Sequence, residues 1–299
     1  MRRDLRMAGA GIPEAFQMYS FEGVDNEDQG AEVQPDRITI MGNIDWPLDI
    51  KIADYQGAAA SLTLDDESFE QYPYSDDFYV NKTVLILPNE SSSCTAGEVR
   101  TITHVTHDAS GSTEKFNFSS GLSDVNPPLN LKGTCSSSDD YDGGTILLVD
   151  VKVYWLDATG TQSGLTAGVN GYLGQAGVFY MTDNGVHYPL AQNIENFQLQ
   201  YNGDLDDDGV LDGFTNWNTN WSLDEIGRIR QIKAQILGRT ANRFVGVSGK
   251  PDAAIHLYRR PVMANSPAAT TDDLHRRFLL ESTSNVRNHS LNLYNQGER

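Results

Sequence analysis

Five aspartates crowd into residues 204–212, where the sequence reads DLDDDGVLD. Asp204, Asp206 and Asp208 alternate, Gly209 follows directly, and Asp212 lies four residues after Asp208. Carboxylates this close repel one another unless solvent and salt screen them or a cation binds them. The spacing therefore makes cation binding the first chemistry to consider.

The stretch fits much of a calcium-loop template. Gly209 would supply the sharp turn at position six, and Thr215 stands at position twelve, where a bidentate Glu would be expected. The loop is therefore not an EF-hand, although Asp224 or Glu225 could complete the ligand shell. Magnesium fits less well, because it tends to keep its waters. The predicted calcium ligands are oxygens of one loop: Asp204, Asp206, Asp208, Val210 through its backbone carbonyl, and Asp212. The alternative is an acidic surface turn that solubilises a hairpin end.

Charge and length limit the possible partners. The chain has 299 residues, enough for one large domain or two ordinary ones, and its balance of charged and hydrophobic residues is that of a folded protein. The formal net charge of −19 argues against non-specific binding to nucleic acid or to an anionic membrane surface. We expect no polyanion partner.

The two cysteines, Cys94 and Cys135, both lie in Ser- and Gly-rich, loop-like segments without CxxC spacing. We predict that they form one disulfide, which favours an oxidising compartment. Two free surface thiols in a cytosolic protein remain the alternative.

The N-terminal residues look like the end of a helix. Residues 1–12 combine helix formers (RRDLRMA) with helix stoppers (GAGIP), and neither a leader nor an apolar run of about 20 residues is found. We expect these residues to be the last turns of a longer helix.

Strand-like alternation dominates the rest of the chain. The residues from 106 to 144 are rich in Ser, Gly, Asp, Asn and Pro and predict a long loop or hairpin excursion. Asn184-Gly185 predicts a type I′ hairpin turn, and Ser222 with Glu225 predicts a capped helix. The simplest architecture is one β-rich domain over 1–299. Strands are expected at 36–44, 82–88, 98–107, 145–157, 174–191, 194–204, 230–240 and 275–295.

Other catalytic or metal-binding signals are weaker. His104 and His107 lie three apart, and on a strand their side chains should point to opposite faces, so we expect surface histidines. The sequence contains no GxSxG, HExxH, P-loop or Rossmann pattern. We expect no enzyme; a hydrolase that uses paired carboxylates is a third alternative.

Three stretches together resemble the PilW-type minor pilins of type IV pili, which are similar to the J-type minor pseudopilins of type II secretion. They are RRDLRMAGAG, the long segment 188–240 with its strand, acidic loop and Trp-containing part, and the C-terminal segment 272–288. In the last segment the residues that carry the pattern are Arg276, Arg277, Val286, Arg287 and Asn288. The hydrophobic N-terminal helix of the family is missing, and 106–144 matches nothing in the pattern.

The resemblance implies an α+β fold, predominantly antiparallel β, in which a truncated N-terminal helix packs on a sheet. It implies a structural minor pilin, outside the cytosol on the pilus or cell surface and facing the periplasm before assembly. Such a subunit would help to initiate or cap the filament through other minor pilins, with a tip adhesin as a further candidate partner. It would meet the membrane only through the missing helix. From the spacing of the aspartates, we expect a calcium ion to stabilise residues 204–212 of the acidic loop 204–215.

The alternative function is a secreted calcium-dependent adhesin or carbohydrate-binding β-rich module. In that case Tyr201, Trp217 and Trp221 would stack on sugar rings beside the loop.

Overall fold

Antiparallel strands make up more than half of the described part of the protein in this computed structural model. The structure describes residues 1–13, 16, 20–25, 35–43, 49–56, 61–69, 75–94, 97–107, 114–118, 138–157, 177–241, 258–264, 266 and 274–286. Its helical elements are short: α1 (Arg2–Met7), α2 (Asp66–Phe69), α3 (Asp76–Tyr79), the 3-10 helix η4 (Ser138–Tyr141) and α4 (Leu223–Gly227).

Seven strands form an open sheet in the order β1-β2-β9-β10-β11-β12-β13. Every neighbouring pair is antiparallel. The strands are β1 (Phe21–Val24), β2 (Arg37–Gly42), β9 (Asp150–Asp157), β10 (Gly177–Asp183), β11 (Val186–Gly203), β12 (Ile229–Arg239) and β13 (Arg277–Asn285).

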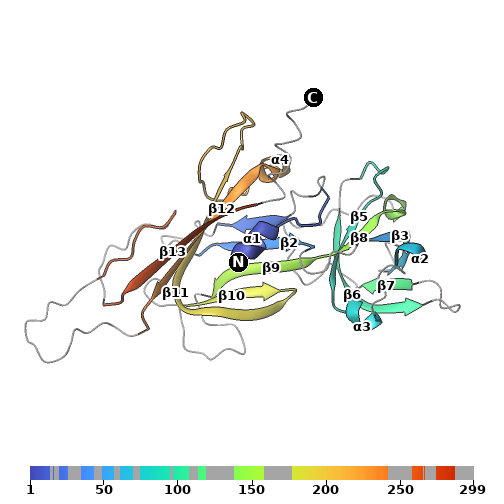
Figure 1. The fold of residues 1–299 in the computed structure, drawn as a ribbon, viewed down its shortest axis with the longest axis horizontal. Helices are drawn as coiled ribbons and strands as arrows, with labels where there is room; N and C mark the ends of the chain where they lie inside the picture. The colour runs from blue at the N-terminus through green and yellow to red at the C-terminus, as the bar shows by residue number, and fades with distance from the viewer. Residues whose placement is uncertain are drawn as a thin grey trace, which may run out of the picture.

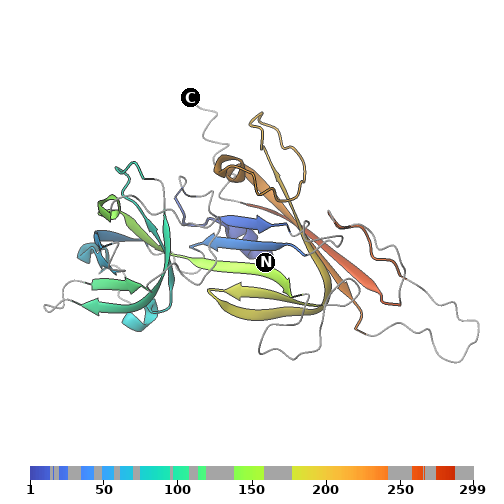
Figure 2. The ribbon, with the colours of Figure 1, turned by 180° about the vertical axis from the view of Figure 1, so that it is seen from behind.

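The other six strands close into a barrel, in the order β3-β4-β7-β6-β5-β8, because β3 pairs with β8. They are β3 (Asp49–Gln56), β4 (Ser61–Leu64), β5 (Thr83–Leu87), β6 (Glu98–His107), β7 (Glu114–Phe118) and β8 (Thr145–Leu148). The barrel is inserted between β2 and β9, which are neighbours in the sheet. Only Val149 separates β8 from β9, so one nearly continuous strand passes from the barrel at one end of the molecule into the sheet (Figures 1 and 2).

Three hydrophobic clusters stabilise this arrangement. One lies on the sheet and includes Leu5 and Ala8 from the N-terminal segment, and a second, which includes Phe116, fills the barrel. The third joins the two parts, since it contains Met41 and Val151 from the sheet together with barrel residues such as Leu85. The barrel and the sheet therefore share a packed junction.

The predicted fold class is wrong. The protein is mostly β with a closed six-stranded barrel and a curled sheet, and it does not have a pilin-like fold in which a helix packs on a sheet. The N-terminal helix α1 has six residues. A long loop or hairpin excursion was predicted over 106–144; in this range β6 extends to His107 and pairs antiparallel with β7, and η4 follows later. Pairing between segments far apart in the chain closes the barrel, and alternation along one strand does not reveal such pairing.

Several local predictions are confirmed. Asn184 and Gly185 form the β10–β11 turn with φ of 45° and 87°, as a type I′ turn requires. Ser222 and Glu225 form a full capping box on α4. β11 and β12 are strands as predicted, and Phe197, Leu199 and Ile232 of their apolar faces are buried, although polar residues of the opposite face such as Gln198 and Gln235 are buried too. The residues from 275 to 286 contain one strand, β13. The rest of the predicted C-terminal strand region, from 287, lies outside the described residues.

Candidate metal centres

The acidic loop begins where β11 ends. It is closed at its base, because Asp212 N donates to Gly203 O at 2.9 Å and Tyr201 and Thr215 form a two-way backbone bridge. Gly213 N donates to Asn202 Oδ1 at 3.0 Å. The long strand therefore holds both ends of the loop.

Within the loop, aspartate side chains fold the backbone around themselves. Asp204 Oδ1 and Oδ2 accept from the N–H groups of Asp208 and Gly209 at 2.9 and 3.0 Å. Asp206 Oδ1 accepts from Asp208 N at 3.3 Å, and Asp208 Oδ1 accepts from Val210 N at 2.8 Å. Gly209 has a φ of 84°, in the left-handed region that favours glycine. These bonds direct the carboxylates of alternate residues toward one point.

Asp204, Asp206 and Asp208, the aspartate triad, bring one carboxylate oxygen each within 4.8 Å of the others. Within the part of the chain that the structure describes, none of the three forms an ion pair within 4.0 Å. Asp207, by contrast, pairs with Arg228 at 3.1 Å. Three converging carboxylate oxygens are ligands that a hard cation such as Ca²⁺ prefers.

The remaining predicted ligands lie apart from this point. Asp212 Oδ2 accepts from Leu205 N at 2.7 Å, so this side chain braces the base of the loop. Asp224 pairs with Arg228, and Glu225 Oε2 accepts from Ser222 in the capping box. Val210 is 63% exposed at the loop tip. The structure therefore brings three of the five predicted ligands together, and water would have to supply further ligands.

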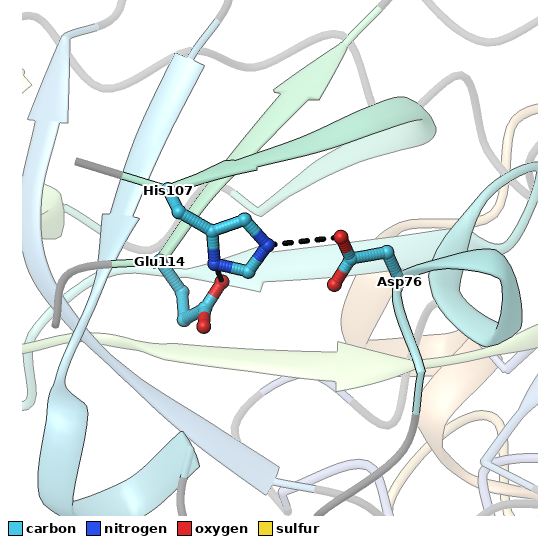
Figure 3. A group of neighbouring side chains, drawn as sticks. All are labelled: Asp76, His107 and Glu114. Atoms are coloured by element: carbon cyan, nitrogen blue, oxygen red, sulfur yellow. Dashed lines mark hydrogen bonds and ion pairs between the residues drawn. The ribbon is translucent and has the colours of Figure 1, made fainter. Parts of the chain in front are cut away.

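A second group of possible ligands joins Asp76, His107 and Glu114 in the barrel part of the molecule (Figure 3). His107 Nε2 lies 2.9 Å from Asp76 Oδ2, and His107 Nδ1 lies 2.6 Å from Glu114 Oε2. The hydrogen bond with Asp76 raises the pKa of His107, and the charges of both carboxylates add to the effect. Because the two ring nitrogens point in opposite directions, this geometry suits an imidazolium held between two carboxylates better than three ligands on one metal ion.

Sequence reasoning missed this group. It treated His107 together with His104, but the partners of His107 come from α3 and from the neighbouring strand, where Glu114 lies directly opposite. Because 106–144 was interpreted as a loop or hairpin excursion without a defined strand, the pairing of Glu114 opposite His107 was not expected. In EKFNF, at 114–118, Phe116 and Phe118 alternate with polar residues, and this pattern could have predicted the strand that carries Glu114.

The aromatic residues beside the acidic loop belong to the core. Tyr201 is 1% and Trp217 8% exposed, and their ring centroids lie 5.2 Å apart in an edge-to-face contact. Trp221 packs against the same cluster. The buried rings of Tyr201 and Trp217 cannot stack on a sugar, and Trp221 is partly buried, so the three residues do not form the exposed stacking surface that was predicted.

Cys94 is disulfide-bonded. The only other cysteine of the chain, Cys135, lies outside the described residues, as do Arg287 and Asn288 of the family resemblance. Arg276, Arg277 and Val286 are described: Arg277 and Val286 pack at the two ends of β13, and Arg276 donates to the Tyr258 hydroxyl.

No described helix is long and apolar enough to cross a bilayer. Comparison of the chain with protein-family models, with curated proteins and with solved structures finds no match. The resemblance to PilW-type minor pilins therefore stays a prediction.

Proposed function

We propose that this protein is a non-enzymatic β-rich structural or binding module, acting outside the cytosol, whose acidic loop binds Ca²⁺. The observation that carries the proposal is the convergence of the aspartate triad at the end of β11. A backbone that already bonds to the carboxylates would lose little conformational entropy when the ion arrives. The disulfide at Cys94 supports an oxidising compartment, where calcium reaches the levels that weak sites need.

In this proposal, calcium would stabilise the conformation of the acidic loop. The triad concentrates negative charge at the end of β11, in a chain whose net charge is already −19. A divalent cation removes that repulsion and ties the loop tip to the strand. The ordered loop would then present Val210, Leu211 and Phe214, which are 63%, 46% and 36% exposed, as a fixed surface.

The minor-pilin role is not the function proposed here, because the fold that it implies is not the fold of this protein. The carbohydrate-binding role has less support, because Tyr201 and Trp217, two of its three proposed stacking residues, are buried. The calcium loop depends on neither role.

Isothermal titration calorimetry with Ca²⁺ tests the proposal, with Mg²⁺ as a second titrant. We expect a Kd of about 10⁻⁴ to 10⁻³ M for Ca²⁺, as in extracellular calcium modules, and weaker binding of Mg²⁺. An attraction of about 1 kcal/mol per unit-charge pair in water becomes about 2 kcal/mol for a divalent ion, so Asp208→Asn should weaken binding by about 30-fold.

Asp207→Asn is the matched control. Asp207 lies in the same loop and carries the same charge, but its side chain is directed to Arg228. Its φ of 64° is one that asparagine accepts readily. We expect this variant to change the Kd much less than Asp208→Asn does. Equal effects of the two substitutions, or no heat of binding in the parent protein, would show that the loop is only an acidic turn.

A further inference from the structure

β13 is the last strand of the sheet, and no strand among the described residues pairs with its outer edge. Proteins usually protect such an edge with a proline, a bulge or charged side chains. β13 has no proline and pairs with β12 without a register shift. Its first half instead exposes three consecutive apolar side chains, with Phe278 at 67%, Leu279 at 42% and Leu280 at 64%.

The hydrogen bonds to β12 show which backbone groups of β13 point outward. Thr240 N donates to Arg276 O, and Val286 N donates to Arg230 O, each at 2.9 Å. In an antiparallel ladder, alternate residues bond to the same neighbour, so the even-numbered residues of β13 bond to β12. The N–H and C=O groups of the odd-numbered residues, which include Leu279, therefore point away from the sheet.

We propose that a second copy of this chain adds its own β13 to this edge, antiparallel, about a two-fold axis at Leu279. Leu279 then pairs with Leu279 of the second copy, and Arg277 pairs with Glu281 of the second copy. All of these residues have outward-pointing backbone groups, so the two strands can exchange a regular set of hydrogen bonds. The result is one continuous sheet across the dimer.

The charges and apolar residues of β13 select this register. Centring the axis on Arg277 or on Glu281 would place like charges opposite each other, which destabilises a strand pair. Centring it on Leu279 places Glu281 opposite Arg277, which is already bound with Arg239 to Glu195, a buried group of two positive charges and one negative charge. It also puts Phe278 opposite Leu280 of the second copy, twice by symmetry, so four exposed apolar side chains meet on one face. This self-complementarity is the reason to assign the edge to a second copy.

Near Arg277, the other face of β13 is covered by its own chain. Arg277 Nη1 donates to Tyr258 O at 3.1 Å, and Asn196 Nδ2 donates to Ser266 Oγ at 3.0 Å on the neighbouring part of the sheet. The contact between the two copies therefore involves the edge and the face that carries Phe278 and Leu280.

The net charge gives the dimer a distinctive salt dependence. Two chains of charge −19 repel each other at long range, and added salt screens that repulsion over a Debye length of about 8 Å at physiological ionic strength. The contacts at β13 are mostly apolar and backbone contacts, which salt does not weaken. Association should therefore become stronger from low to physiological salt.

Sedimentation velocity over a range of micromolar concentrations tests the proposal. We expect a monomer–dimer equilibrium that shifts toward dimer with salt. Leu280→Glu should lower the association constant at least tenfold, since it puts a charge against Phe278 of the second copy. Val262→Glu is the matched control, because Val262 is also 64% exposed but lies outside the strand, and it should leave association unchanged.

Glu281→Lys tests the register. It makes the chain less acidic, which would favour association of any kind, but the proposed pairing places the introduced ammonium group opposite the second copy's buried group of Arg277, Arg239 and Glu195, whose net charge is positive. We expect weaker dimerisation. Because an ammonium group cannot accept from Gln235 as the Glu281 carboxylate does, urea unfolding of the monomer is measured as well, so that dimerisation is compared under conditions in which the variant is folded. A monomer at all concentrations would overturn the proposal and leave the edge to a different partner. Stronger dimerisation of Glu281→Lys, or equal effects of Leu280→Glu and Val262→Glu, would also overturn it.

Discussion

Glu195→Gln removes a buried charge that ties three strands together. Glu195 lies at a bulge of β11, between Ile194 and Asn196 in the pairing with β12, and its side chain is 3% exposed. Arg277 of β13 binds it with two nitrogens, at 2.6 and 3.0 Å, and Arg239 of β12 approaches to 3.4 Å. Gln keeps the shape of the side chain but leaves two nearly buried guanidinium groups without this counter-charge.

The expected loss is large because the arginines cannot easily return to water. Their side chains are 8% and 11% exposed. Removing one partner of a buried ion pair costs about 3–5 kcal/mol. At about 2–4 °C per kcal/mol for a large domain, the unfolding temperature should fall by about 6–20 °C.

Urea unfolding followed by circular dichroism gives the free energy of unfolding of each variant. Glu281→Gln is the control, since Glu281 is exposed and Gln can still accept from Gln235; it should change stability by less than about 0.5 kcal/mol. Arg277→Met should cost less in the Glu195→Gln background than in the parent. A loss below about 1 kcal/mol for Glu195→Gln would refute the reasoning that burial makes this pair indispensable.

Two further predictions concern the barrel. The hydrogen bond with Asp76 raises the folded-state pKa of His107 above its ordinary 6.5, so the stabilisation is fully present below that pH and is lost as pH rises through the folded-state pKa. The free energy of unfolding should therefore decrease with pH above about 6.5. His107→Gln should remove this dependence and His104→Gln should keep it; the opposite pattern would contradict the assignment. Phe116→Ala should cost about 3–5 kcal/mol in urea unfolding, because Phe116 is fully buried in the barrel core. Phe214→Ala, at a ring that is 36% exposed, should cost much less, and equal losses would mean that the barrel interior is not packed as described.

Much of the local structure could be predicted from the sequence. Turn chemistry identified the Asn184-Gly185 hairpin, the capping box identified α4, and alternation identified β11 and β12. These features depend on residues close together in the chain. The aspartate triad belongs to the same class, because its carboxylates converge through hydrogen bonds within one loop.

Alternation did not reveal which face of a strand lies inside. In β9, Tyr154 and Leu156 face the core of the sheet, and on the opposite side Val151 is buried in the junction with the barrel. Trp155 lies on the same face of β9 as Val151 and is only partly buried. A strand that passes between two structural units is covered on different faces along its length. The alternation of apolar residues therefore cannot indicate one buried face for the whole strand.

The sequence by itself determined many of the strands, the Asn184-Gly185 turn and the acidic loop, because each is set by the conformations and hydrogen bonds of neighbouring residues; the strands β1, β3, β4 and β7 were not predicted. Only the tertiary structure decided that β3 pairs with β8 to close a barrel, that His107 lies between Asp76 and Glu114, and that Trp217 is buried. Those outcomes depend on contacts between distant segments, whose free energy is gained only after the chain has closed the loops between them. A local pattern carries no record of those contacts.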